Sequence, residues 1–214
     1  MESKVLNNVE PKKIGFSMYT DFYNSSQIIA FGDSIDELVD SVIYFRNIKF
    51  ISNFIDNFIQ FLSNSNLRKL EEAIITISNT EFVSSNLVYF ASRIAQKSKI
   101  KDYDFSTIEK YVLNYNSDFI IARLSPYASK DFFYTAQSIV CKSNDARLIN
   151  YFTQEVFAFS KHKSLLDLNE LHEAILKTSN KFYIVEFEVR FMGRKPTFWD
   201  KFLHDNFSGS GVYY

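Results

Sequence analysis

The sequence predicts an all-α protein of stacked helical hairpins, forming a short right-handed α-solenoid with atypical capping helices at both ends. The segment Glu72–Asn79 returns with few changes as Glu173–Asn180, and an aromatic residue, Phe82 or Tyr183, follows each at the same offset. Such self-similarity is the signature of stacked repeat architectures. The 214 residues also include only three prolines and five glycines. An all-β sandwich or a nucleotide-binding α/β fold needs more turn-forming glycine.

Three weaker copies of this segment join the two clear ones. The five copies begin at Leu38, Leu70, Ile108, Thr135 and Leu171, at spacings of 32, 38, 27 and 36 residues. Each copy reads as two short helices joined by a tight polar turn, because apolar residues recur three and four positions apart. One hairpin alone cannot bury both of its apolar stripes. We therefore expect about five hairpins to stack into one body.

Helix start signals precede several copies. Ser34 with Glu37, and Ser106 with Glu109, match the capping box, and Asp167 begins a close analogue. The recurring Ser–Asn pair is expected to end the first helix and cap the second, since Asn tolerates left-handed geometry and accepts backbone N–H bonds. Each second helix is predicted to open with a large apolar pair: Phe50/Ile51, Phe82/Val83, Phe119/Ile120, Leu148/Ile149 and Tyr183/Ile184.

The chain is predicted to hold one domain with loose ends. We expect residues 1–13 to be a flexible segment, residues 14–205 to be a single helical repeat domain, and residues 206–214 to be a flexible tail. The first 13 residues are polar and lack the apolar centre of a signal peptide. No apolar run is long enough to span a membrane. We therefore expect a cytoplasmic protein without a membrane partner.

Two terminal segments differ from the repeats. The aromatic-rich residues 16–31 are interpreted as a helix that caps the first hairpin. Thr197 is predicted to start a closing helix that carries Trp199, the single tryptophan of the chain. Trp199 has two interpretations: part of this cap, or an exposed anchor for a partner.

No motif for catalysis is recognised. Glycine-rich phosphate loops, the Gly-x-Ser-x-Gly elbow and the H-E-x-x-H zinc motif are absent from the sequence. His172 aligns with Glu71 at a position taken to face solvent, and Cys141 is interpreted as packing. We expect no enzyme activity, no metal and no cofactor. The acidic residues are interpreted as first-turn complements of the helix macrodipole: Asp36/Glu37, Glu71/Glu72, Glu109 and Glu170/Glu173.

The charge balance disfavours a strongly electropositive nucleic-acid binder, which would carry an excess of basic residues. Lysine and arginine total 24, against 25 aspartates and glutamates. Nucleic-acid binding by a basic inner face nevertheless stays open as an alternative, because affinity for a duplex backbone is largely electrostatic. The residues that would carry it are Lys97, Lys99, Lys101, Arg123, Lys130, Lys142 and Arg147.

Two segments carry a resemblance to a known class of repeats. Residues 72–91, with Phe90–Ala91, and next residues 173–187, show a helix ending in E-A-I-I/L-x-x-S-N, followed by a helix that opens with an aromatic–aliphatic pair. This pattern resembles the degenerate helical-hairpin repeats of bacterial and bacteriophage proteins, and the architecture resembles a HEAT-type α-solenoid. The resemblance covers about residues 35–190. It implies scaffolding or partner binding and transfers no catalytic residue.

The leading hypothesis is a non-enzymatic protein–protein interaction module that binds a partner on its repeat surface. One version is a viral or mobile-element protein that inhibits a host factor in the host cytoplasm. A divergent enzyme with its site in the groove is a third possibility, and self-association is left open. The second helices are expected to line the concave face, and the partner-binding residues are predicted to be Asn86, Tyr89, Arg93, Arg123, Tyr151, Glu155, Arg190 and Trp199.

Overall fold

The computed structural model describes residues 34–77, 80–98, 100, 102–198 and 200. These residues form helices and connecting turns, with no strand among them, which confirms the all-α class. The described part of the chain divides into two compact units, one ending at Tyr115 and the other beginning at Asn116. The expectations for residues 1–13, 16–31 and 206–214 fall outside the described residues, and the single domain over 14–205 stays a prediction.

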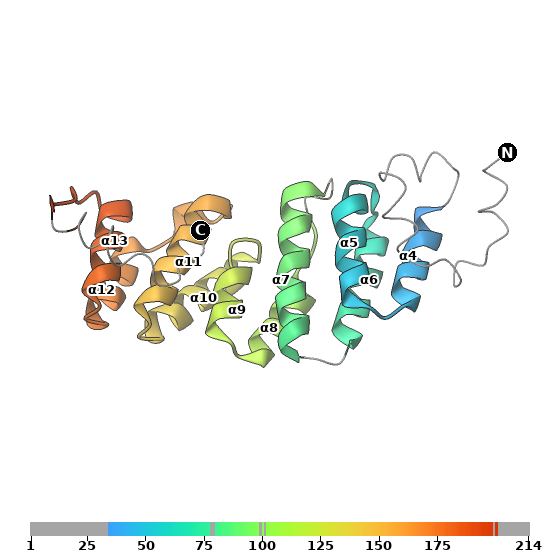
Figure 1. The fold of residues 1–214 in the computed structure, drawn as a ribbon, viewed down its shortest axis with the longest axis horizontal. Helices are drawn as coiled ribbons and strands as arrows, with labels where there is room; N and C mark the ends of the chain where they lie inside the picture. The colour runs from blue at the N-terminus through green and yellow to red at the C-terminus, as the bar shows by residue number, and fades with distance from the viewer. Residues whose placement is uncertain (1–33, 78–79, 99, 101, 199, 201–214) are drawn as a thin grey trace. The chain divides into compact units, whose positions relative to one another are not determined.

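The described part of unit 1 consists of two hairpins and one further helix, α4 to α8 (Figure 1). Helix α4 pairs with α5, and α6 pairs with α7, which in turn contacts α8. In addition α4 packs against α6, and α5 packs against α7. The first helices of the two hairpins thus form one layer and the second helices another. The bounds are α4 Ile35–Tyr44, α5 Ile48–Phe58, η2 Ile59–Phe61, α6 Asn64–Thr76, α7 Thr80–Lys97 and α8 Ser106–Tyr115.

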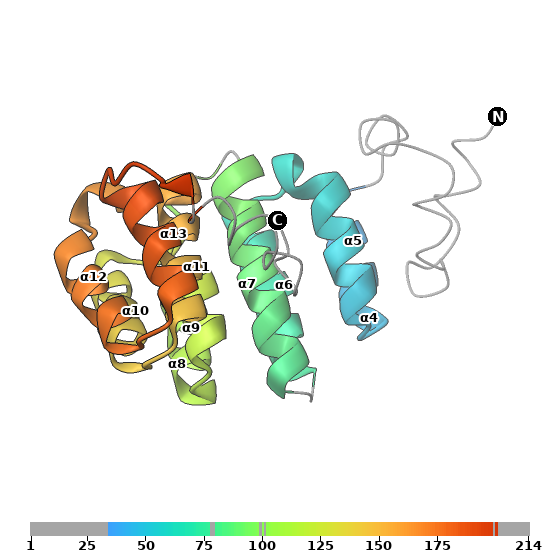
Figure 2. The ribbon, with the colours of Figure 1, turned by 60° about the vertical axis from the view of Figure 1, so that its left-hand side comes forward.

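Unit 2 repeats this arrangement (Figure 2). Helices α10 and α12 pack together in one layer, while α9, α11 and α13 form the other, with α11 in contact with both α9 and α13. Among the described helices of the chain, none is both long and apolar enough to cross a membrane. The bounds are α9 Asp118–Leu124, α10 Lys130–Lys142, α11 Ala146–Phe159, η3 Lys163–Leu165, α12 Leu168–Lys177 and α13 Lys181–Phe191.

The strongest sequence repeat occupies the same structural position in both units. Helix α6 ends at Thr76 and α12 ends at Lys177, 101 residues later (177 − 76), which is also the offset between the two repeated segments. Ile74 and Ile175, at equivalent positions, are 1 % and 0 % exposed. The predicted apolar stripe is therefore buried in both copies.

The turns between paired helices share one geometry. After the first helix, one residue adopts the left-handed backbone conformation, with positive φ, and the next residue is the N-cap of the second helix. The sequence prediction for the Ser–Asn pair is partly correct at Ser179 and Asn180. Asn180 caps α13, and its Oδ1 accepts the Tyr183 N–H, but the left-handed residue is Ser179 and not the asparagine. Left-handed residues other than glycine cost free energy, and Asn bears that cost best. The four described turns are Arg46–Asn47, Asn116–Ser117, Asn144–Asp145 and Ser179–Asn180.

The predicted apolar pair Phe119/Ile120 is wrong by one residue. Ser117 is the N-cap of α9. The third and fourth residues after it are Ile120 and Ile121, which are buried at 5 % and 0 % exposure. Phe119 is instead 49 % exposed, because a shift of one position turns a side chain about 100° around the helix axis.

The capping predictions are partly correct. Ser34 caps α4 and Asp167 caps α12, each accepting backbone N–H groups. Ser106 does not act as an N-cap, because α8 already begins there. Its own N–H donates to Asp104 Oδ1 at 3.0 Å, so the aspartate two residues earlier satisfies the helix start.

Glu71 and Glu72 do not lie in a first turn, contrary to the sequence interpretation. Helix α6 begins at Asn64, after Ser63 forms a capping box with Asn66. Glu71 consequently falls in the middle of the helix and is only 1 % exposed. The solvent-facing assignment of Glu71 was therefore wrong.

In each unit a buried polar side chain, Glu71 or Gln137, belongs to a helix of the layer that α6 and α10 occupy. It binds residues at or just before the start of the next helix along that layer. Glu71 accepts hydrogen bonds from the Tyr103 hydroxyl and from Arg68 Nη1, the latter at 3.0 Å. Gln137 donates to Glu170 Oε2 at 2.7 Å and accepts the Asp167 N–H at 3.2 Å. Glu71 and Gln137 each lie eight residues after an N-cap serine, in α6 and in α10 respectively.

Burial raises the pKa of Glu71, and the hydrogen bond from Tyr103 and the charge of Arg68 only partly oppose it. With the folded pKa above the unfolded value, the folded state keeps a proton that the unfolded chain releases, so stability falls as pH rises above about 4.5. We predict that Glu71→Gln reduces this loss of stability with rising pH, because glutamine does not titrate. Gln137, at the equivalent position of unit 2, shows that an amide fits there. Urea unfolding followed by circular dichroism between pH 4.5 and 7.5 measures it.

The matched control is Glu72→Gln, on the exposed neighbour of Glu71, which should follow the wild-type pH dependence. Identical pH dependence in both variants would contradict the assignment of the raised pKa to Glu71.

The equivalence of the two repeat copies predicts equal sensitivity to truncation. Ile74→Ala and Ile175→Ala should each lower the free energy of unfolding by about 2–5 kcal/mol, because each leaves a cavity in a closed core. Leu176, the next residue, is 45 % exposed, and Leu176→Ala should cost about 0.5 kcal/mol. Chemical denaturation of the three variants provides the comparison. A buried-site variant as stable as Leu176→Ala would rule out equivalent burial.

Candidate protein-binding groove

In unit 1, the predicted partner-binding residues Asn86, Tyr89 and Arg93 make contacts between α5 and α7. The Ser52 hydroxyl donates to Asn86 Oδ1 at 3.1 Å. The Tyr89 hydroxyl donates to Asp56 Oδ2. Arg93 Nε forms an ion pair with Asp56 Oδ1 at 2.7 Å, and its guanidinium lies 4.7 Å from the centre of the Tyr89 ring. These three predicted residues therefore fasten α7 to α5.

In unit 2 three predicted residues come together between α9 and α11. The Arg123 guanidinium lies 5.8 Å from the centre of the Phe119 ring, and that ring lies 5.2 Å from the ring of Tyr151. Burial raises the pKa of Tyr151 to about 12, and burial also raises the pKa of Glu155. The positive charge of Arg123 opposes both shifts. Arg123 thus faces a partly buried carboxyl and an aromatic pair.

Arg190, the remaining described residue of the predicted set, lies on α13. Its Nη2 pairs with Glu186 Oε1 at 2.8 Å, one helical turn earlier. The other oxygen of Glu186, Oε2, accepts a hydrogen bond of 2.7 Å from Asn150 Nδ2 on α11. This bond connects α11 to α13 just as the bond between Ser52 and Asn86 connects α5 to α7.

A groove of about 630 Å³ lies over the first turns of α9, α11 and α13, the three second-layer helices of unit 2. Tyr151 is the one predicted partner-binding residue that lines it, and Arg147 is the one lining residue from the nucleic-acid set. Sequence reasoning missed Phe119 and Asn150 as groove residues. The full lining is Asp118, Phe119, Ser143, Asp145, Arg147, Leu148, Asn150, Tyr151, Gln154, Tyr183 and Glu186.

The charged side chains that line the groove are mostly acidic. Asp118, Asp145 and Glu186 contribute three carboxylates, against one guanidinium from Arg147. Asp145 Oδ1 already accepts the backbone N–H groups of Arg147 and Leu148 as the N-cap of α11. The groove therefore carries more negative than positive groups.

Asn150 is the most deeply buried polar residue of the lining, at 3 % exposure. Its Nδ2 is held by the Glu186 carboxylate. A carboxylate accepts but does not donate, so this bond fixes which end of the amide is nitrogen. Among the described residues, no donor reaches Asn150 Oδ1. A buried acceptor without a hydrogen-bond donor is rare in folded proteins, so Asn150 Oδ1 is a candidate to accept a hydrogen bond from a ligand or water.

The four predicted nucleic-acid-binding residues of unit 2 are divided between its two layers. Lys130 and Lys142 lie at opposite ends of α10, in the other layer from Arg123 on α9 and Arg147 on α11. The Lys130 ammonium group lies 5.7 Å from the centre of the Tyr134 ring. In unit 1, Lys97 is exposed at the end of α7, and Lys99 and Lys101 fall outside the described residues.

The segment after α13 is anchored by charged groups. Gly193 has a φ of +72°, and it reverses the chain after α13. Arg194 then pairs with Glu188 at 2.5 Å and with Asp200 at 3.1 Å. Thr197 and Asp200 exchange hydrogen bonds of 2.7 and 3.2 Å that resemble a capping box, as expected for a helix start. The side chain of Trp199 lies outside the described residues, so both of its interpretations stay predictions.

His172 is also not the ordinary surface residue that the sequence suggested. Its Nε2 lies 3.0 Å from Glu188 Oε1, and its ring stacks against the buried Phe187. The same Glu188 carboxylate binds Arg194, whose hydrogen bond is the main cause that lowers the pKa of Glu188. His172 thus helps to hold the end of α13.

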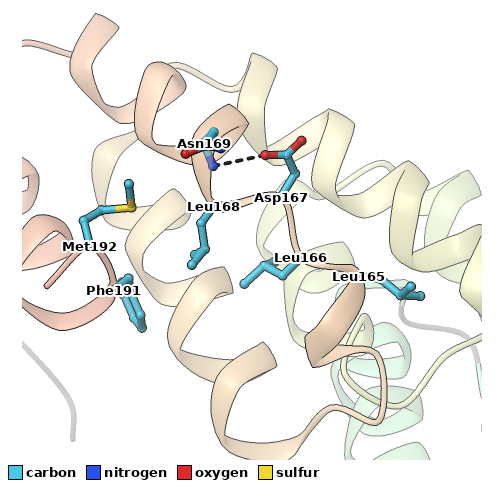
Figure 3. A pocket seen from close by; sticks show the side chains of 7 residues that line it. All are labelled: Leu165, Leu166, Asp167, Leu168, Asn169, Phe191 and Met192. Carbon is cyan, nitrogen blue, oxygen red and sulfur yellow. Dashed lines mark hydrogen bonds between the residues drawn. The ribbon is translucent and has the colours of Figure 1, made fainter.

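A second pocket, of about 590 Å³, lies at the edge of α12 and α13 (Figure 3). Its single carboxylate, Asp167, is occupied by the backbone N–H of Asn169 at 3.0 Å, drawn as a dashed line in the figure. The remaining side chains are mostly aliphatic or aromatic and indicate no particular ligand chemistry. The lining is Leu165, Leu166, Asp167, Leu168, Asn169, Phe191 and Met192.

Burial, followed by the negative charges of Glu170 and Asp167, raises the pKa of the Cys141 thiol to about 12. A thiol with so high a pKa is a poor nucleophile at neutral pH. No cluster of three or more metal-binding side chains occurs among the described residues.

Comparisons of the chain with protein-family models, with curated proteins and with solved structures found no match. The candidate function therefore depends on the geometry of the groove.

Proposed function

We propose that the protein is a non-enzymatic interaction module that binds a partner protein in the groove over α9, α11 and α13. The observation that carries the proposal is the combination of a half-exposed aromatic side chain, Phe119, with the Tyr151 ring and several polar groups in one concavity. Aromatic residues are enriched at protein interfaces, and a few aromatic anchors often contribute most of the binding energy.

The groove is well suited to binding because its walls are held in place. Asn150 and Glu186 join α11 to α13, and the contact between Phe119 and Tyr151 joins α9 to α11. Side chains on packed helices lose little conformational entropy when a partner binds. A prearranged surface of this kind supports recognition by complementary shape.

The proposal includes stacking of the hairpins into a right-handed, HEAT-like solenoid. Support comes from the hydrogen bonds that link successive helices of one layer, which join residues 29–36 positions apart in both units. Separations in this range are typical of the spacing of helical-hairpin repeats. Solenoids of such repeats present extended surfaces to their partners.

The proposed biological role follows the resemblance to bacteriophage-type repeats: a viral or mobile-element protein that inhibits a host factor in the cytoplasm. Nucleic-acid binding is the weaker alternative. The groove lining is richer in carboxylates than in guanidinium groups, and carboxylates repel a phosphate backbone.

The test uses the full chain to isolate its stoichiometric protein partner from the native host, followed by affinity measurements with the purified partner. We predict that Phe119→Ala weakens binding at least about tenfold, since truncating an interface aromatic removes more than about 1.4 kcal/mol. Calorimetry or surface plasmon resonance gives the dissociation constants.

Tyr134→Ala is the matched control. Tyr134 is an aromatic residue on α10 that is 45 % exposed, comparable to Phe119, but it lies in the other layer. Its truncation should leave the affinity unchanged. The proposal fails if no protein partner is recovered, or if Phe119→Ala binds as tightly as the wild type.

A further inference from the structure

We infer that the groove recognises an arginine side chain, presented by an extended basic segment of the partner protein. This inference rests on the proposed function and specifies the chemistry of the partner. It draws on three independent features of the lining: its charge, its unpaired acceptor and its exposed aromatic ring.

The first feature is charge. Three carboxylates against one guanidinium line the groove. Counting also Arg190, which pairs with Glu186, the acids still exceed the cations by three to two. Both oxygens of Glu186 already accept bonds, from Arg190 and from Asn150. Asp118, in the first turn of α9, is therefore the principal carboxylate for an incoming cation.

The second feature is the acceptor Asn150 Oδ1. It is buried, its orientation is fixed by Glu186, and no described residue donates to it. Leaving a buried acceptor unpaired costs free energy that a ligand donor restores. A guanidinium group carries five N–H donors in a planar fork and no acceptor. It can pair with a carboxylate of the groove and, once the side chains that cover Asn150 Oδ1 move aside, also donate to that oxygen. An ammonium group lacks this fork.

The third feature is the aromatic pair. Phe119 is 49 % exposed and lies against Tyr151 with ring centres 5.2 Å apart. Planar guanidinium groups stack favourably on aromatic faces. Within the chain, Arg123 already lies 5.8 Å from the centre of the Phe119 ring. A partner guanidinium would therefore stack on the part of the Phe119 ring that Arg123 leaves exposed.

An extended segment fits better than a folded surface because the groove crosses three helices. Its lining runs from Asp118 on α9, across α11, to Tyr183 and Glu186 on α13. The one arginine would then pair with Asp118, and neighbouring basic residues of the segment would face Asp145.

The test selects peptides from a random displayed library on the full-length protein and measures the dissociation constants of the synthetic peptides by fluorescence anisotropy. We expect arginine to be enriched at one position. Replacing that arginine by citrulline, its neutral isostere, should weaken binding at least about tenfold, and lysine should bind with intermediate affinity.

Protein variants complete the test. Asp118→Asn should weaken binding of the arginine peptide at least about threefold and leave the citrulline peptide unaffected, since only the cation loses a charge partner. Asp131→Asn is the matched control, because Asp131 is an exposed first-turn aspartate of α10 in the other layer, and it should bind as the wild type does.

The outcomes separate this inference from the proposed function. Peptides that depend on Phe119 but show no preference for arginine would overturn the inference and leave the interaction module in place. Peptides that bind independently of both Phe119 and Asp118, or no selected peptides at all, would overturn both. Tighter binding of a 20-base-pair DNA duplex than of any selected peptide at the same salt concentration would also overturn both.

Discussion

Contact between successive helices of the same layer is the constraint on which the rest of the structure depends. A hairpin that packs only on itself leaves one apolar stripe of each helix in water. In unit 1, α4 packs on α6 and α5 on α7, and in unit 2, α10 packs on α12 while α11 lies between α9 and α13. These contacts bury the repeated isoleucines Ile74 and Ile175 almost completely. They also decide which polar side chains meet, and so where a groove can form.

The same kind of contact has different consequences in the two units. Between α5 and α7, the polar side chains of Asn86, Tyr89 and Arg93 pair with their neighbours. Across α9, α11 and α13, the contacts between Phe119 and Tyr151 and between Asn150 and Glu186 hold the helices together and leave a concavity. Asn150 has one end of its amide in that scaffold and the other without a described partner. Shared architecture therefore does not imply shared surface chemistry.

The sequence predicted the features that depend on repetition. The all-α class and the common end point of α6 and α12 follow from apolar spacing, which reports burial directly. Arg123 and Tyr151 lie on the second helices α9 and α11, as helical periodicity predicted, and their part in binding a partner stays a prediction. The solenoid as a whole, with its handedness, stays a prediction.

Other features depend on contacts between distant residues, which a local pattern does not encode. Glu71 looks like a solvated acid in sequence, yet Tyr103, 32 residues later, makes its burial tolerable. Phe119 was predicted as the first residue of the apolar pair that opens α9, but the buried pair is Ile120 and Ile121. The exposure of Phe119 is what makes it a groove residue. The open acceptor of Asn150 becomes visible only once Glu186 is seen to hold the other end of the amide.

The most direct test of the account is a double-mutant cycle on the bond that holds two second-layer helices together. The free energy of unfolding would be measured for the wild type, Asn150→Ala, Glu186→Ala and the double variant. Two side chains in direct contact should show a coupling energy of at least about 0.5 kcal/mol. A coupling energy indistinguishable from zero would contradict the side-by-side packing of α11 and α13, and with it the groove that they form.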